Sequence, residues 1–103
     1  MLTKYGININ SQNIQDNLCR IGNQIFKLLP MREEGKNWIK PLETLIVEIV
    51  GWCSLFPDQK DLLALCAKLE GLRACGEDSE FKFYRRTIFE ACGIVDKLKD
   101  ELE

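Results

Sequence analysis

The chain has 103 residues, of which 46% are apolar and 29% are charged, a balance typical of one globular domain and not of a disordered chain. Its formal net charge of −2 is too small for a protein held on nucleic acid by charge alone, and too small for an acidic DNA mimic. No apolar stretch approaches the roughly 20 residues that span a bilayer, and residues 1–6 lack the apolar core of a signal peptide, so we expect a cytoplasmic protein without membrane contact.

Residues 1–10 predict a short extended N-terminal arm, because Ile7 and Ile9 alternate with asparagines. A lone strand is unstable, so this arm would pack on the rest of the chain or pair with another chain. The first helix is expected to begin near Ser11, a favourable N-cap, and to end at Pro30, since a proline disfavours helical geometry in the residue before it. Its apolar side chains recur at spacings of three and four, as one buried stripe would: Ile14, Leu18, Ile21, Ile25 and Leu28.

The second predicted helix has Pro41 in its first turn and ends at Pro57. Apolar residues occupy most of its girth, and its polar stripe is narrow: Lys40, Glu43, Thr44, Glu48 and Ser54. A helix with this distribution is either central in the fold or half of an interface.

Asp58 is the expected N-cap of a third helix, which Gly76 should end as the residue after the C-cap. Its apolar stripe is Leu62, Leu65, Cys66, Leu69 and Leu72. Asp78 or Ser79 should cap a fourth helix, whose apolar residues follow a three-four spacing for three heptads: Phe81, Tyr84, Ile88, Ala91, Val95, Leu98 and Leu102. Residues 11–103 are therefore predicted to form a single all-α domain, a compact four-helix bundle.

Each predicted helix contains one interior glycine: Gly22, Gly51, Gly71 and Gly93. Such a glycine costs about 1 kcal/mol relative to alanine, so four of them favour close helix crossings, with neutral drift as the alternative. The five cysteines are odd in number and far apart in sequence. They are expected to be small buried thiols in a reducing cell and not a disulfide scaffold.

Histidine is absent from the sequence, which removes the commonest general base and the usual zinc and haem ligands. A zinc site made of cysteines needs close ligand pairs, and the cysteines are not paired in this way. The sequence also lacks a glycine-rich phosphate loop that follows a strand. We therefore expect no catalytic residue, no metal, no cofactor and no small-molecule substrate.

Two segments are candidate binding surfaces. Phe83, Arg86 and Phe89 lie off the heptad seam of the fourth helix, and aromatic residues beside arginine are typical of binding hot spots. The alternative is that this helix is buried on two sides. Trp38 follows a charged connection and is either part of a recognition loop or a ring packed on the second helix.

The leading hypothesis is a non-enzymatic helical module that binds protein and forms a homodimer. Its size and composition are those of phage or mobile-element accessory proteins, such as inhibitors or assembly factors. The dimer contacts are expected to be Trp52, Phe56, Phe83 and Phe89. The alternative hypothesis is a nucleic-acid-associated regulator, in which one basic turn touches phosphates through Lys82, Arg85 and Arg86. An enzyme or small-ligand binder would need a polar pocket, which the sequence does not indicate.

Overall fold

The structure, a computed structural model, describes residues 11–101. Four α-helices and one 3-10 turn follow in order: α1 (Ser11–Glu33), α2 (Ile39–Leu55), α3 (Lys60–Cys75), η1 (Gly76–Asp78) and α4 (Phe81–Glu101). The predicted all-α, four-helix architecture is confirmed. The expected N-terminal arm and Leu102 lie outside the described residues.

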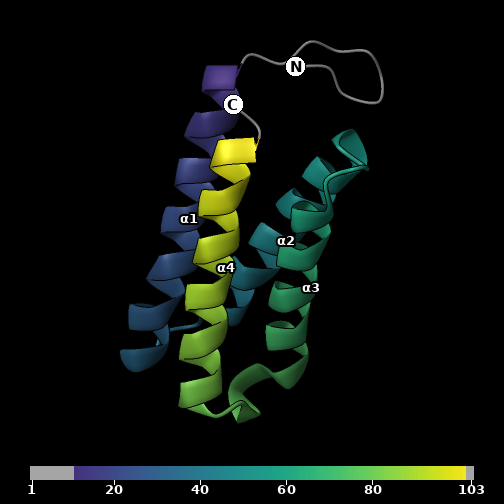
Figure 1. Cartoon of the computed structure of the whole chain (residues 1–103). Coiled ribbons are helices and arrows are strands. Elements are labelled where there is room, and N and C mark those ends of the chain that lie inside the picture. The colour runs from purple at the N-terminus through teal and green to yellow at the C-terminus, as the bar shows by residue number, and fades with distance from the viewer. Residues whose placement is uncertain (1–10, 102–103) are drawn as a thin grey trace.

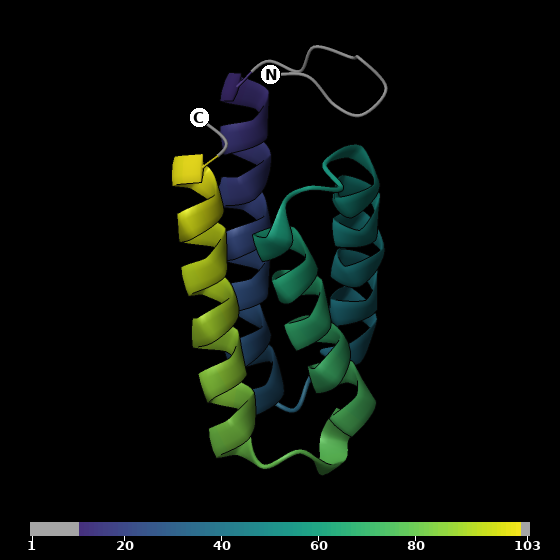
Figure 2. The same ribbon diagram turned by 45° about the vertical axis from the view of Figure 1, so that its right-hand side comes forward.

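The four helices are joined by short connections, so each runs antiparallel to the next, as in an up-down-up-down bundle (Figures 1 and 2). The most extensive packing is between α1 and α4, and α3 packs on both α4 and α2. The start of α1 and the end of α4 meet at one end of the bundle, where Gln15 Nε2 donates to the carbonyl of Lys99 at 2.7 Å.

The hydrophobic core contains the apolar stripes that the sequence predicts. The α1 stripe and the middle of the α4 stripe are buried, and Leu62, Leu65, Leu69 and Leu72 supply the α3 stripe. From α2 only one face enters this core, through Leu42, Leu45, Ile46 and Ile49. The spacing of apolar residues at three and four is thus sufficient to identify the buried side of each helix.

Helix α2 is not central, although its composition allowed that interpretation. It packs on α3 and less extensively on α1. Val47 and Val50 lie on its outer face and are 73% and 45% exposed. The excess of apolar residues in α2 therefore faces outward.

Pro30 does not end the first helix, contrary to the prediction. α1 continues to Glu33, and the carbonyl of Pro30 accepts the N–H of Glu34 at 2.9 Å. The missing N–H of Pro30 would have donated to the carbonyl of Phe26, and both residues are exposed, so water can satisfy that carbonyl. The helix ends instead at Glu33, and Gly35 two residues later has a φ of +73°, which suits a glycine after a helix.

Two predicted helix caps are also wrong. Gln59, not Asp58, is the N-cap residue of α3, and its side chain makes no capping hydrogen bond. The hydroxyl of Ser79 donates to the carbonyl of Gly76 at 2.8 Å, three residues before it, within the η1 turn. Gly76 does follow α3 as predicted, with a φ of +58° and its N–H bonded to the carbonyl of Leu72.

The four interior glycines do not share one cause. A Cβ on Gly22 would lie 3.3 Å from Cγ1 of Val95, so the predicted close crossing is confirmed between α1 and α4. A Cβ on Gly51, Gly71 or Gly93 would meet no atom within 4 Å, and the close-crossing prediction is wrong for these three.

All five cysteines are free thiols, but they are not all buried as expected. Cys19 and Cys75 are exposed, whereas Cys53, Cys66 and Cys92 are half-buried between helices. Burial raises the pKa of the Cys53, Cys66 and Cys92 thiols, so these three are protonated at neutral pH. A buried structural role fits only these three cysteines.

Candidate functional site

Trp38 is a core residue and not an exposed recognition residue. It is 2% exposed, and its ring lies edge-on to that of Tyr84 with 4.8 Å between centroids. Trp38 immediately precedes α2, so the chain enters the helix with this side chain directed into the bundle. The alternative of a packed ring is correct, although the ring packs on α4.

Trp52 and Phe56 are also withdrawn from the surface. Their rings stack at 5.8 Å, Phe56 is 7% exposed and Trp52 is half-buried. They lie near the end of α2, whereas Phe83 and Phe89 lie in the first half of α4, which runs parallel to α2, so the two pairs are at opposite ends of the bundle (Figure 1). The structure therefore does not bring the four expected dimer contacts into one surface.

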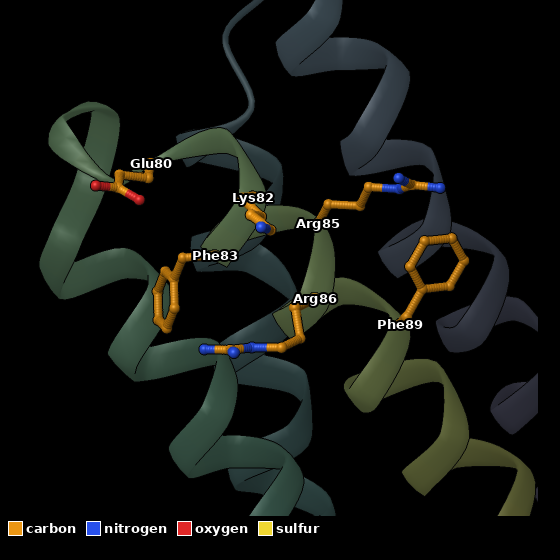
Figure 3. A pocket seen from close by; sticks show the side chains of 6 residues that line it. All are labelled: Glu80, Lys82, Phe83, Arg85, Arg86 and Phe89. Carbon is orange, nitrogen blue, oxygen red and sulfur yellow. The ribbon is translucent and has the colours of Figure 1, made fainter.

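The first half of α4 carries an open groove of about 400 Å³. It is lined by the five residues that the sequence singled out on α4 and by Glu80: Glu80, Lys82, Phe83, Arg85, Arg86 and Phe89. Figure 3 shows Phe83 and Arg86 directed toward α3, and Arg85 and Phe89 directed toward α1. We call this surface the α4 groove. It contains both predicted residue sets, the aromatic-arginine set and the basic turn.

An arginine lies over each of the two aromatic rings in the α4 groove. The guanidinium carbon of Arg86 is 6.0 Å from the centroid of Phe83, and that of Arg85 is 5.4 Å from the centroid of Phe89. Both distances are within the range of cation–π attraction. Phe89 is 47% exposed and Phe83 is half-buried against the core, so the α4 groove has apolar walls that solvent can reach.

The aromatic surface extends beyond α4 onto α1. Phe26 is 50% exposed, and its ring lies edge-on to Phe89 at 6.0 Å. The sequence analysis did not single out Phe26, because it is adjacent to the buried Ile25 and resembles a flank of the same stripe. The available signal was its displacement by one residue from the three-four spacing, which directs it away from the core.

The positive charge of the α4 groove is only partly neutralised. Arg86 is 3.8 Å from Glu90, but Glu90 also binds Lys68 at 3.2 Å. Within residues 11–101, neither Lys82 nor Arg85 forms an ion pair. Arg73, by contrast, bridges from α3 to Glu43 of α2 at 3.5 Å. The α4 groove thus presents two cations that lack a carboxylate partner in the described part of the chain.

No protein-family model matches the chain, and no curated protein or solved structure matches it. No helix within residues 11–101 is long and apolar enough to cross a bilayer. The chemistry of the α4 groove therefore carries the functional interpretation.

Arg32 and Tyr84 hold the α4 groove in place, and the sequence analysis missed both roles. Arg32 donates to the hydroxyl of Ser79 at 2.8 Å and to its carbonyl, and its guanidinium carbon lies 4.6 Å from the Tyr84 ring centroid. The hydroxyl of Tyr84 donates to the carbonyl of Leu28. These bonds tie the end of α1 to the start of α4. No local motif marks them, because the partners are far apart in sequence.

Two other surface hollows are weaker candidates. One, of about 370 Å³ between α1 and α2, is lined mainly by uncharged side chains and Lys27. The other, of about 200 Å³ between α1 and α4, includes Cys19, Cys92 and Asp96. Among residues 11–101, no group of three cysteine or carboxylate side chains is placed to hold a metal ion.

Proposed function

We propose that this chain is a non-enzymatic helical module that binds another protein through the α4 groove. The observation that carries the proposal is the pairing of Arg85 and Arg86 with the solvent-accessible rings of Phe89 and Phe83. Aromatic and arginine residues are the types enriched in binding hot spots. Because the cation–π contacts already hold each arginine against a ring, a partner would lose less side-chain entropy in binding them.

A protein partner is favoured over nucleic acid because the charge along this part of α4 is mixed. The three cations of the basic turn are bordered by Glu80 and Glu90, which would repel a continuous phosphate backbone. The regulator hypothesis stays the second candidate, supported by the unpaired Lys82 and Arg85.

Self-association belongs to the same proposal, but on a different surface. Val47 and Val50 are exposed on α2, and solvent-exposed aliphatic side chains on one helix face support a contact with a second copy.

The five free thiols support a role in a reducing compartment such as the cytoplasm. A phage-type inhibitor or assembly factor would act through a protein-binding surface such as the α4 groove.

The proposed function is tested by affinity purification from the native host with tagged wild-type protein and with the double variant Arg86→Ala/Phe89→Ser. Both substituted side chains are exposed, so the variant should retain its melting temperature. The matched control is Leu63→Ser, which removes an apolar side chain that is 54% exposed on α3. We expect a protein that co-purifies with the wild type and the control but is lost with the double variant.

Equal recovery of every co-purifying protein with the wild type and the double variant would reject the α4 groove as the binding site. Recovery of nuclease-sensitive nucleic acid, with binding that falls steeply as salt increases, would favour the regulator hypothesis instead.

A further inference from the structure

The α4 groove combines apolar walls with uncompensated positive charge, and this combination defines the chemistry of its occupant. We propose that it binds an acidic amphipathic peptide segment of the partner protein, with carboxylates on Lys82 and Arg85 and an apolar side chain against the ring of Phe83 or Phe89. This inference rests on the proposed protein-binding function and adds the class of the bound segment.

The argument from charge concerns Lys82 and Arg85. Within residues 11–101 these two cations have no carboxylate partner, and Arg86 shares Glu90 with Lys68. A bound carboxylate would therefore gain a charged partner without breaking an existing ion pair. Lys82 and Arg85 are three residues apart on one helix and thus lie on the same side of it. Two carboxylates one helical turn apart on a partner helix would match this spacing.

The argument from shape concerns the aromatic rings. Phe83 and Arg86 lie on the α3 side of the α4 groove, and Phe89 and Arg85 lie on its α1 side, with Lys82 between the two pairs (Figure 3). Phe26 extends the apolar wall beyond Phe89. A leucine or aromatic side chain on a segment that crosses α4 could contact the accessible part of one of these rings, while flanking carboxylates would reach the cations. A purely acidic chain would leave these walls exposed to water.

The experiment is a selection from a random peptide library displayed on phage, with immobilised full-length protein as bait. We expect the enriched peptides to combine Asp or Glu with Leu, Phe or Trp. The best peptide is then synthesised with a fluorescent label and titrated by polarisation. For the variant Lys82→Glu/Arg85→Glu we expect affinity to fall about tenfold or more, because both attractive contacts become repulsive.

The matched control is Lys40→Glu/Lys60→Glu, which changes the net charge of the protein equally and alters exposed lysines in the first turns of α2 and α3. This control should bind like the wild type. Melting curves of both variants confirm that they are folded. Binding should also weaken between about 50 and 300 mM salt, since added salt screens exposed charges.

Several outcomes would overturn the inference: no enrichment, a basic or uncharged consensus, equal loss of affinity in the control, or a labelled single-stranded oligonucleotide that binds more tightly than the best peptide. Peptide affinity that falls as the protein concentration rises, with formation of a complex between two copies that excludes the peptide, would assign the α4 groove to self-association. The co-purification test is independent, since a partner lost with Arg86→Ala/Phe89→Ser would keep the proposed function even if the acidic class is wrong.

Discussion

At the scale of single residues, Arg32 is the side chain on which the placement of the α4 groove most depends. It crosses from the last turn of α1 to Ser79, just before α4, and its guanidinium carbon also lies 5.5 Å from the Trp38 ring centroid. A planar guanidinium can bind a hydroxyl and a carbonyl while it lies over aromatic rings, and an ammonium group lacks this geometry. Arg32 therefore joins three segments that are separated in the sequence.

We expect Arg32→Ala to lower the free energy of unfolding by about 2 kcal/mol, the sum of lost hydrogen bonds and cation–π contacts. Arg32→Lys should recover less than half of this loss, because lysine lacks the planar donors. Denaturant unfolding monitored by circular dichroism measures both changes. The control Arg73→Ala removes an exposed ion pair with Glu43 and should cost less than about 1 kcal/mol. A similar small cost for Arg32→Ala would contradict the anchoring role.

Tyr84 gives the protein a specific sensitivity to alkaline pH. Burial raises its pKa above the ordinary value of 10.0, and the charge of Arg32 offsets only part of this rise. The unfolded chain releases the phenolic proton near pH 10, whereas the folded chain retains it. The stabilisation is therefore fully present below pH 10 and is lost as the pH rises above 10.

We expect the free energy of unfolding of the wild type to fall above pH 10 more steeply than that of Tyr84→Phe, by up to about 1.4 kcal/mol per pH unit. Other groups titrate in both proteins and cancel in the comparison. Denaturant unfolding at several pH values between about 8 and 11 measures the difference. Parallel curves for the two proteins would mean that Tyr84 ionises in the folded state as readily as in the unfolded chain.

At the scale of helices, one of the four interior glycines has a packing role and the other three have none that the structure shows. Only Gly22 lies against another helix, and the open surroundings of Gly51, Gly71 and Gly93 provide no packing reason for a glycine. Alanine at the latter three positions keeps the helical backbone and lowers the conformational entropy of the unfolded chain.

We expect Gly51→Ala, Gly71→Ala and Gly93→Ala each to raise the free energy of unfolding by about 0.5 to 1 kcal/mol. Gly22→Ala should gain less or become destabilising, because its new methyl group would lie 3.3 Å from Val95 Cγ1 and Val95 must move. Thermal and denaturant unfolding of the four single variants provides the comparison. An equal gain at all four positions would show that α1 and α4 are not in close contact at Gly22.

The helices could be predicted from the sequence more reliably than their ends. Apolar spacing reports the buried side directly, which is why the stripes of α1 and α3, and that of α4 from Tyr84 to Leu98, were predicted correctly. Phe81, the first residue of the predicted α4 stripe, is 40% exposed, so the prediction was wrong there. The predictions of a helix end at Pro30 and of an N-cap at Asp58 were wrong because local sequence signals for helix ends are weak compared with tertiary contacts. Extending α1 past Pro30 places Arg32 on Ser79 and the Tyr84 ring, and this gain is invisible in the local sequence.

The candidate site shows the same division. Phe83, Arg86 and Phe89 could be placed on one side of α4 from their spacing, because that depends on a single helix. The contribution of Phe26 and the burial of Trp38 and Phe56 depend on how different helices pack, so the sequence could not distinguish them. The same aromatic residue types occur on the surface and in the core, and only the tertiary environment distinguishes them.

At the scale of the whole molecule, the outer face of α2 is the surface on which we expect a second copy. Sedimentation equilibrium at micromolar concentrations should give twice the 11.9 kDa monomer mass. Val47→Asp should return a folded monomer, because Val47 is 73% exposed within one chain, and its melting temperature should no longer depend on protein concentration. Leu45→Asp should instead unfold the domain, because Leu45 is 3% exposed and an unpaired buried carboxylate costs more than about 4 kcal/mol.

A single species at the monomer mass for the wild type would reject the dimer and leave Val47 and Val50 for contact with a different protein. Loss of the fold in Val47→Asp would show that the outer face of α2 is covered within one chain.

The meeting of the first turn of α1 and the last turn of α4 at one end of the bundle determines how the domain would respond to mechanical force. If a force probe pulled on handles attached at Ser11 and Glu101, it would separate α1 from α4 one layer at a time, beginning at the bond between Gln15 and Lys99. Moving one handle to the η1 turn, at the opposite end, would load the layers together in shear. The domain should therefore open at low force in the first geometry and resist in the second.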